Sequence, residues 1–513
     1  MTETTSTAAH PPGSDVVGVG RAAPAEVVGV GRAADAAAAE VMGVGRVVAE
    51  APYRWRWVVL AIVLVAEIMD LLDSTVITIA APTVRADLGG GTSTMQWWAA
   101  GYTLAFGVLM IVGARLGDMF GRRRVFLIGI AGFTLASTAC ALAPSPDFLI
   151  ATRVLQGGFG ALLIPQGLGV IKNVFGPKEM GGAFAAFGPV MGLAAIAGPI
   201  LAGWLVAADL LGTGWRMIFL VNLPLGIAGF LGALRFMPES RSPLKIRLDP
   251  VGVTLISTAS LCIIYPLVQG RELSWPLWVF GVLAGGLALL GVFARAERRT
   301  HRTPMIEPSL LRNRAYTSGL VVGIAFFAGF AGLLMPFSVF LQAGLHFSPE
   351  HAGLTLVPMS LATAITAGGS YALIPRFGRA VLQTGLLIVV GSLVGLAVTV
   401  SSGGADLSTW DLAPAMFALG LGLGFVFGPL FNVILAGVGD HEVGSASGTL
   451  NAVQQLGNSV GVALLATIFF SIVDHGHSSP TAMARTALIA AGLMALSFAL
   501  SFLLPRQARM EEY

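Results

Sequence analysis

Long apolar runs separated by short polar breaks recur from Trp57 almost to the end of the chain. A helix needs roughly 20 mostly apolar residues to cross about 30 Å of hydrocarbon, and the runs are of that order. Only 11% of the residues are charged, whereas a soluble domain usually carries about 25%. Because so little charge is available to coat a water-facing surface, the sequence predicts an all-α, polytopic membrane protein.

The apolar runs divide into about fourteen predicted spans. Glycine and proline inside them are compatible with membrane helices, where both residues are common. The predicted spans are 57–82, 95–116, 124–143, 148–171, 181–206, 217–237, 251–268, 276–294, 317–341, 350–374, 381–400, 412–437, 445–472 and 486–504.

Residues 1–52 have a different character, because alanine, glycine and valine dominate and VVGVGRAA occurs at both 16–23 and 27–34. Glycine at alternate positions weakens helices and strands, so this segment is predicted to be a disordered tail. It has no unbroken apolar stretch behind a positive cluster and therefore does not resemble a signal peptide.

The distribution of lysine and arginine predicts the orientation. With a cytoplasmic N-terminus, 25 of the 30 basic residues fall on the inside and Arg153 lies within a span. Both termini are then cytoplasmic. The basic residues that remain outside are Arg85, Arg216, Arg271 and Arg485.

The loop 295–316 holds six arginines and divides the spans into six, an inserted pair and six more. This division predicts two similar six-helix bundles with a two-helix hairpin between them. The predicted parts are a cytoplasmic tail (1–52), an N-terminal bundle (53–238), a linker with the hairpin (239–295), a basic cytoplasmic loop (296–316), a C-terminal bundle (317–505) and a second cytoplasmic tail (506–513).

Acidic residues in the interior of the spans occur only in the first one, at Glu67, Asp70 and Asp73. A spacing of three places them on one broad helix face, which must point to protein or water because charges in lipid are costly. Desolvation and mutual repulsion disfavour charged carboxylates, so these groups are candidates to take up and release protons. The competing interpretation is that they only pair with other charges to hold helices together.

Arg153 is the intramembrane basic residue, and its depth can be compared with that of Asp73. Counting from the outer ends of their spans at 1.5 Å per residue, the two depths differ by about 6 Å, which a long arginine side chain can bridge. We therefore predict that Arg153 neighbours Asp73 or Asp70. Four asparagines are candidate polar contacts or helix–helix partners: Asn222, Asn432, Asn451 and Asn458.

The segment GARLGDMFGRRR, residues 113–124, resembles the cytoplasmic-loop motif of the major facilitator superfamily. Glycines allow close helix approach and a tight turn, and Asp118 could cap the next helix or pair with an arginine across the bundle interface. The resemblance implies a gating role for this loop. Its matching residues are Gly113, Gly117, Asp118, Gly121, Arg122 and Arg123.

Three further segments resemble the fourteen-span drug:proton antiporter family of that superfamily. They are LDSTVITIAAP at 72–82, RVLQGGFGALLIP at 153–165 and GLAAIAGPILAG at 192–203. The resemblance implies that Asp73 takes part in proton coupling or in binding a cationic drug, and that Arg153 takes part in proton movement. It also implies that the third segment, with Gly198, Pro199 and Gly203, marks an antiporter. The second half of the chain matches less well, because Pro375 stands where the loop motif has an acid.

These features together predict secondary active export of small, lipophilic or cationic molecules in exchange for protons, by alternating access across a bacterial plasma membrane. A symporter or importer, or a lipid or metabolite transporter of the same fold, is the alternative. A channel is disfavoured because no repeated polar pore face or charged ring is evident. The expected partners are a small-molecule substrate, protons and the lipid bilayer, with a monomer as the default state.

Several other classes of protein do not fit the sequence. No phosphate-binding loop, nucleophile motif or pair of catalytic acids points to an enzyme, and no cofactor is expected beyond the proton gradient as the energy source. The two cysteines and seven histidines do not form a metal-binding pattern. The net charge of +3 comes from basic residues in short loops, so nucleic acid is not an expected partner.

Overall fold

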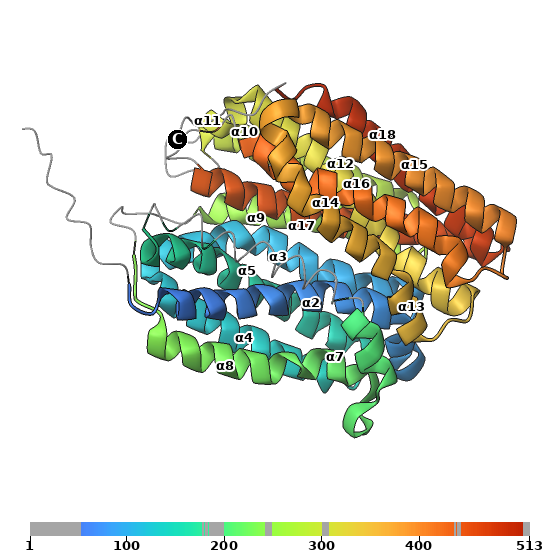
Figure 1. The fold of residues 1–513 in the computed structure, drawn as a ribbon, viewed down its shortest axis with the longest axis horizontal. Helices are drawn as coiled ribbons and strands as arrows, with labels where there is room; N and C mark the ends of the chain where they lie inside the picture. The colour runs from blue at the N-terminus through green and yellow to red at the C-terminus, as the bar shows by residue number, and fades with distance from the viewer. Residues whose placement is uncertain are drawn as a thin grey trace, which may run out of the picture. The chain divides into compact units, whose positions relative to one another are not determined.

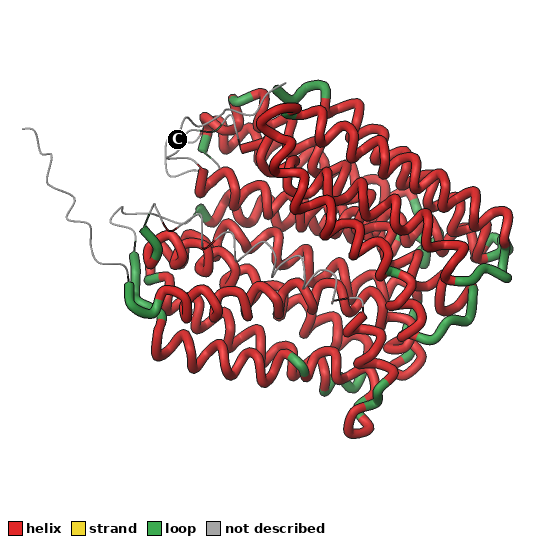
Figure 2. The backbone as a smooth tube through the Cα atoms, viewed as in Figure 1, coloured by secondary structure: helices red, strands yellow, loops and turns green. Residues whose placement is uncertain are grey.

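The structure, a computed structural model, describes residues 53–176, 179, 183, 198, 200–241, 249–299, 307–435, 438 and 443–505. Every regular element in these ranges is a helix (Figure 1, Figure 2). Twelve of the described helices are long and apolar enough to cross a membrane, and they coincide with all the predicted spans except 57–82 and 181–206.

The two remaining predicted spans have different outcomes. The first lies within α2 (Arg56–Leu88), a continuous helix of 33 residues that carries the three acids. The second lies mostly outside the described residues, as do the predicted tails 1–52 and 506–513. The all-helical membrane fold is therefore confirmed, while the total of fourteen spans stays a prediction.

Helices from the first half of the chain pack together into what we call the first helix group. Its central contacts join α3 to α5, α4 to α5 and α8, and α2 to α5 and α8. The figure shows these helices in blue to green (Figure 1). Besides α2 the group contains α3 (Thr92–Phe120), α4 (Arg122–Ala141), α5 (Pro146–Val174), α7 (Met217–Leu220) and α8 (Asn222–Phe236).

Helices from the second half form the second helix group, in which α12 packs on α17 and α18, and α16 packs on α14 and α15. A short π-helical turn, Phe340–Gly344, follows α12. The members are α12 (Arg314–Val339), α13 (Pro349–Thr355), α14 (Val357–Phe377), α15 (Arg379–Gly403), α16 (Thr409–Leu435), α17 (Val443–Asp474) and α18 (Ser479–Ser501).

Between the two groups in sequence lie α9 (Pro250–Gln269) and α10 (Leu277–Arg299), which pack against each other as a hairpin. Helix α9 also contacts α3 of the first group and α17 of the second. A five-residue helix, α11 (Pro308–Arg312), precedes α12. The hairpin therefore touches both groups through one of its two helices.

The helices have two ends, which we name from the chain segments that lie there. The terminal end holds the start of α2, the end of α8 and the connections α3–α4 and α14–α15, and the distal end holds the connections 89–91, 142–145, 270–276, 404–408 and 475–478 (Figure 1). Local signals set these boundaries. Ser145 and Ser478 accept hydrogen bonds from the backbone of the following turn, as N-cap residues do.

Two glycines with positive φ mark equivalent connections in the two groups. Gly121 (φ 104°) separates α3 from α4, and Gly378 (φ 53°) separates α14 from α15. An L side chain is strained in this region of backbone space, whereas glycine is not. The second connection therefore keeps a positive-φ glycine between its two helices, although its ψ of −131° differs from the 130° of Gly121 and its sequence has lost the acidic residue.

Contacts between the two groups run from the distal end to about the middle of α3, where the Thr103 and Ser459 hydroxyls share a hydrogen bond and Gly107 packs against Gln455 of α17. Gln342 Nε2 donates to the carbonyl oxygen of Ile79 at 2.8 Å. Buried Gln96 and Thr467 exchange hydrogen bonds of 3.1 and 3.2 Å between α3 and α17. In this conformation, polar contacts hold the groups together at that end.

The hairpin connection adds further contacts at the distal end. The Arg271 guanidinium pairs with Asp474 at the end of α17 and donates to the Thr92 hydroxyl at the start of α3. Glu272 Oε1 accepts from the backbone nitrogen of Ser93 at 3.1 Å. Arg271 of the hairpin thus connects α3 with α17, and the adjacent Glu272 adds a contact with α3.

Candidate functional site

Asp73 lies in the interior of the first helix group, where its side chain is only 1% exposed. Its carboxylate forms an ion pair with the Arg153 guanidinium of α5. Gln156 Nε2 donates to Asp73 Oδ1 at 2.8 Å, and Asn222 Nδ2 of α8 donates to the same oxygen at 3.2 Å. The predicted proximity of Arg153 and Asp73 is therefore confirmed.

Arg153 has no exposed side-chain surface and is held from several sides. Its Nε donates to the carbonyl oxygen of Trp98 at 3.0 Å, and its Nη1 donates to Gln156 Oε1 at 2.8 Å. The guanidinium carbon lies 4.3 Å from the centre of the Tyr102 ring, a cation–π distance. Nη2 is left without a hydrogen-bond partner among the described residues.

Asp70 occupies a different environment one helical turn away, where it is half-buried. The Tyr102 hydroxyl of α3 donates a hydrogen bond to Asp70 Oδ1. Tyr102 is itself fully buried. The carboxylate thus has one neutral donor, whereas Asp73 has a cation and two amide donors.

Glu67 is 8% exposed. It forms no hydrogen bond or ion pair with any residue that the structure describes. Burial of an unpaired carboxylate is costly unless a proton, a cation or water compensates it. Of the three acids on α2, one is fully paired, one has a single neutral donor and one has no described partner.

A second layer of polar groups surrounds the Asp73 pair. Asn222 Nδ2 also donates to Ser137 Oγ at 3.0 Å, and Ser137 donates to the carbonyl oxygen of Phe219 at 2.9 Å. The Cys140 thiol donates to Gln156 Oε1 at 3.5 Å. These contacts fix the two amide side chains that hold Asp73.

Sequence reasoning identified some of these residues and missed others. It named Asn222 among four asparagines, and Gln156 lies in the segment 153–165 that resembles a family motif, but neither residue was given a specific partner. Tyr102, Ser137 and the Trp98 carbonyl were missed. One tyrosine in an apolar span has no distinctive pattern, and a backbone carbonyl carries no sequence signal at all.

The predicted loop motif forms a close-packed junction at the terminal end. A methyl group added at Gly113 would lie 2.0 Å from the Ala161 carbonyl oxygen, and one at Gly117 would lie 1.7 Å from Gln166 Oε1. Only glycine permits this approach of α3 to α5. The predicted packing role of both glycines is confirmed.

The charged residues of the motif bind within the first helix group. Arg122 Nη2 lies 2.9 Å from Asp118 Oδ1, and Arg122 Nη1 donates to the Gly169 carbonyl oxygen at 2.7 Å. Arg123 donates to the Leu234 carbonyl oxygen of α8. Among the described residues, Asp118 therefore neither caps α4 nor pairs across the groups, because an arginine one turn further along lies within its reach.

The second group contains a related junction without the acid. Arg379 Nη1, directly after Gly378, donates to the carbonyl oxygens of Phe502 and Leu504 at 2.9 and 2.6 Å. In both groups, an arginine beyond the positive-φ glycine thus holds the end of that group's last helix.

The predicted antiporter segment is described only in part. A methyl group at Gly198 would lie 2.8 Å from Thr75 Oγ1 of α2, and one at Gly203 would lie 2.6 Å from the Pro349 carbonyl oxygen. Gly198 therefore packs against α2, and Gly203 against α13 of the second group. Pro199 lies outside the described residues.

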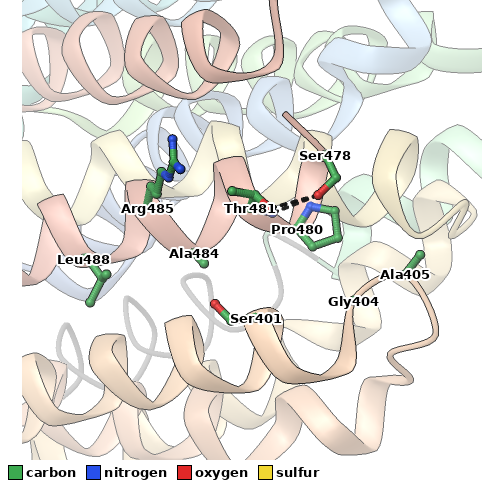
Figure 3. A pocket seen from close by; sticks show the side chains of 9 residues that line it. All are labelled: Ser401, Gly404, Ala405, Ser478, Pro480, Thr481, Ala484, Arg485 and Leu488. Carbon is green, nitrogen blue, oxygen red and sulfur yellow. Dashed lines mark hydrogen bonds between the residues drawn. The ribbon is translucent and has the colours of Figure 1, made fainter. Parts of the chain in front are cut away.

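A surface pocket of about 390 Å³ lies away from the acids, between α15 and α18 at the distal end (Figure 3). Ser401, Gly404, Thr481 and Ala484 are among its lining residues. None of its lining residues is acidic, and it contains no part of the Asp73 network. We therefore place the candidate functional site at the acids of α2.

Comparison with known proteins identifies the family. The model of the Major Facilitator Superfamily matches residues 63–462. The chain belongs to the major facilitator superfamily. It is accordingly a multi-pass membrane carrier. The resemblance of its motifs to the superfamily is confirmed, while the assignment to the fourteen-span family stays a prediction.

Relatives of this superfamily member are found among bacterial export and resistance proteins. The "Probable actinorhodin transporter" of Streptomyces coelicolor is 48% identical over 453 residues, which cover 86% of this chain and 78% of that protein. The "Puromycin resistance protein pur8" of Streptomyces alboniger is 35% identical, with 88% and 89% covered. The "Tetracenomycin C resistance and export protein" of Streptomyces glaucescens is 32% identical, with 81% and 76% covered.

Solved structures of other superfamily members share the fold at low sequence identity. An autoinhibited peptide transporter of the POT family gives a TM-score of 0.64 at 16% identity and covers 88% of this chain and 98% of its own. The human organic anion transporter MFSD10 gives 0.59 at 18% identity, with 87% and 99% covered. These likenesses support the fold and carry no information on substrate.

Proposed function

We propose that the chain exports small organic molecules across a bacterial plasma membrane in exchange for protons. The observation that carries the proposal is the unequal pairing of three intramembrane acids. Asp73 is neutralised by Arg153, whereas Asp70 has only the Tyr102 hydroxyl and Glu67 has no described partner. Protons or a cationic substrate would supply the missing charge compensation.

Export, rather than uptake, is supported by the relatives. The names of the three relatives reported above refer to actinorhodin, puromycin and tetracenomycin C. We propose that lipophilic or cationic antibiotic-like molecules form the substrate class of this chain as well. The contacts of Gly198 with α2 and of Gly203 with α13 are consistent with the antiporter resemblance.

The proposed topology places the terminal end in the cytoplasm, because most lysines and arginines lie there. The distal contacts of Gln342, Gln96 and Arg271 then close the outer side. In this conformation, substrate enters from the cytoplasm or the inner leaflet. We propose that a monomer alternates between this state and one open at the distal end, by rocking of the N-terminal bundle (53–238) against the C-terminal bundle (317–505).

Differential binding supplies the coupling between protons and substrate. A ligand shifts the equilibrium between the two states only if it binds one of them more tightly. The proton and the substrate then change each other's affinity by the same factor. When the carboxylates of α2 are deprotonated they favour a cationic or hydrogen-bonding substrate, and protonation from outside releases it. No bond apart from the carboxyl O–H is made or broken in this cycle.

Transport in inverted membrane vesicles tests the proposal. With an acidic lumen, the wild-type chain should take up puromycin or actinorhodin, and a protonophore should abolish the uptake. Asp73→Asn and Asp70→Asn should each remove the proton-driven component. Uptake unaffected by the protonophore would overturn proton coupling, and transport only in the opposite direction would favour a symporter or importer.

A further inference from the structure

We infer that Tyr102 is a positioning residue that transmits the protonation state of Asp70 to the Arg153–Asp73 pair. The inference rests on the proposed function and deepens it, because it separates the roles of two acids that are neighbours in sequence. Tyr102 contacts both partners at once: its hydroxyl donates to Asp70, and its ring lies against the Arg153 guanidinium.

The position of Tyr102 is tightly constrained. Its side chain has no exposed surface. A methyl group at Gly157 would lie 2.2 Å from the Tyr102 carbonyl oxygen, and one at Gly160 would lie 3.4 Å from its hydroxyl oxygen. The two glycines of α5 thus bring that helix directly onto Tyr102, so the ring has little space in which to move away from Arg153.

The two acids differ in how they can exchange a proton. Asp73 is enclosed by Arg153, Gln156 and Asn222 and is almost fully buried. Asp70 is half-buried and has a single donor. Asp70 is therefore the more accessible of the two, and a change in its charge must affect the group bonded to it.

The proposed step moves one proton from water to Asp70. While the carboxylate is charged, the Tyr102 hydroxyl donates to it. Once protonated, Asp70 can itself donate, and the phenol oxygen can become the acceptor. This reversal makes the phenol ring less electron-rich, which weakens its attraction for the Arg153 guanidinium and so changes the hold of the guanidinium on Asp73.

Other charged groups around this pair are few in the described part of the chain. Glu67 and Asp73 lie one turn before and after Asp70 on α2, and Arg153 faces it from α5. Helix α4 contributes the Cys140 thiol, and α8 contributes the neutral amide of Asn222. Arg153 is the cation among them, and Tyr102 lies against it.

Tyr102→Phe tests the inference, because phenylalanine keeps the ring against Arg153 and removes only the hydroxyl. Tyr316→Phe is the matched control: Tyr316 is also fully buried, and its hydroxyl donates to the Ala446 carbonyl oxygen at 2.8 Å in the second group. The measured quantity is the ratio of the puromycin dissociation constants of purified protein at pH 6 and pH 8.

Allosteric coupling between two ligands commonly changes affinity by about 5- to 150-fold. We expect a ratio in that range for the wild type and for Tyr316→Phe, and a ratio reduced at least about fivefold for Tyr102→Phe. The double variant Asp70→Asn/Tyr102→Phe should match Asp70→Asn, since the hydroxyl acts through Asp70. A purely structural role would weaken binding equally at both pH values.

Two results would overturn the inference. One is a pH ratio for Tyr102→Phe equal to that of the wild type. The other is a loss in the double variant that equals the sum of the two single losses. Failure of the proposed function is a separate outcome, in which the wild type itself shows no proton-driven uptake of puromycin or actinorhodin.

Discussion

Replacing Arg153 by an uncharged residue while Asp73 is retained should be among the single changes that most lower the stability of the first helix group. In Arg153→Met, the carboxylate of Asp73 stays about as buried as before and keeps only the Gln156 and Asn222 amide donors, at 2.8 and 3.2 Å. Breaking a buried ion pair by removing one partner costs about 3–5 kcal/mol, because the other charge is left uncompensated.

The double variant Asp73→Asn/Arg153→Met separates the charge effect from the loss of packing. It removes both charges and should be more stable than Arg153→Met alone, although it carries one more substitution. Thermal unfolding of the purified proteins in detergent measures the difference. The penalty in the single variant should shrink at acidic pH, because protonation of Asp73 removes the unpaired charge.

A double variant less stable than Arg153→Met would contradict this charge effect, since the stability losses of the two substitutions would then add. Unfolding of Arg153→Met at the wild-type temperature would contradict it as well. Either result would mean that the Asp73–Arg153 pair does not hold the charges in a desolvated environment.

Three further predictions concern the surrounding contacts. Asn222→Leu should lower the free energy of unfolding by about 1–3 kcal/mol, because it removes the amide that donates to buried Ser137 and Asp73. Thermal unfolding should show a smaller loss for Asn458→Leu, because its partner Gln455 is less buried. Gly157→Ala should abolish transport in the vesicle assay, because its methyl group would lie 2.2 Å from the Tyr102 carbonyl oxygen. Gly158→Ala should remain active, because the nearest contact of its methyl group is at 3.4 Å. Arg271→Ala should lengthen the distance between spin labels at two exposed positions, Ala207, shortly after Gly203, and Ala405, between α15 and α16, because it removes the Asp474 and Thr92 contacts. An unchanged distance distribution would show that the hairpin connection does not hold the distal end closed.

The sequence predicted that Arg153 neighbours Asp73 or Asp70, because depth in a membrane can be counted along two helices, and the structure shows that the partner is Asp73. Both residues lie in long spans with a fixed rise per residue, so their heights are comparable before any packing is known. The identity of the other donors depends on which faces of α5 and α8 meet α2, and this arrangement is tertiary. Asn222 could therefore not be separated from the other three candidate asparagines.

Asp118 shows the opposite limit. Its resemblance to a loop motif suggested a partner across the bundle interface or a cap on α4, yet the carboxylate binds Arg122 four residues later. The positive φ of Gly121 turns the chain so that Arg122 reaches back to Asp118 and also to the Gly169 carbonyl. Local geometry around one glycine decided the partner, and composition alone does not encode that geometry.

Tyr102 was missed for a related reason. A tyrosine in an apolar span is compatible with lipid contact, core packing or a polar contact, and only the glycines of α5 that pack onto it restrict the choice. Gly157 and Gly160 lie in the segment 153–165 that resembles a family motif, but the residue opposite them could not be named without the contact of α3 with α5.

Proton release on substrate binding tests the central claim most directly. Puromycin is added to purified protein in weakly buffered solution, and the protons that appear are counted with a pH indicator against the amount of puromycin bound. The account predicts measurable release by the wild type and little or none by Asp70→Asn/Asp73→Asn at equal puromycin occupancy. Equal proton release by the two proteins would contradict it.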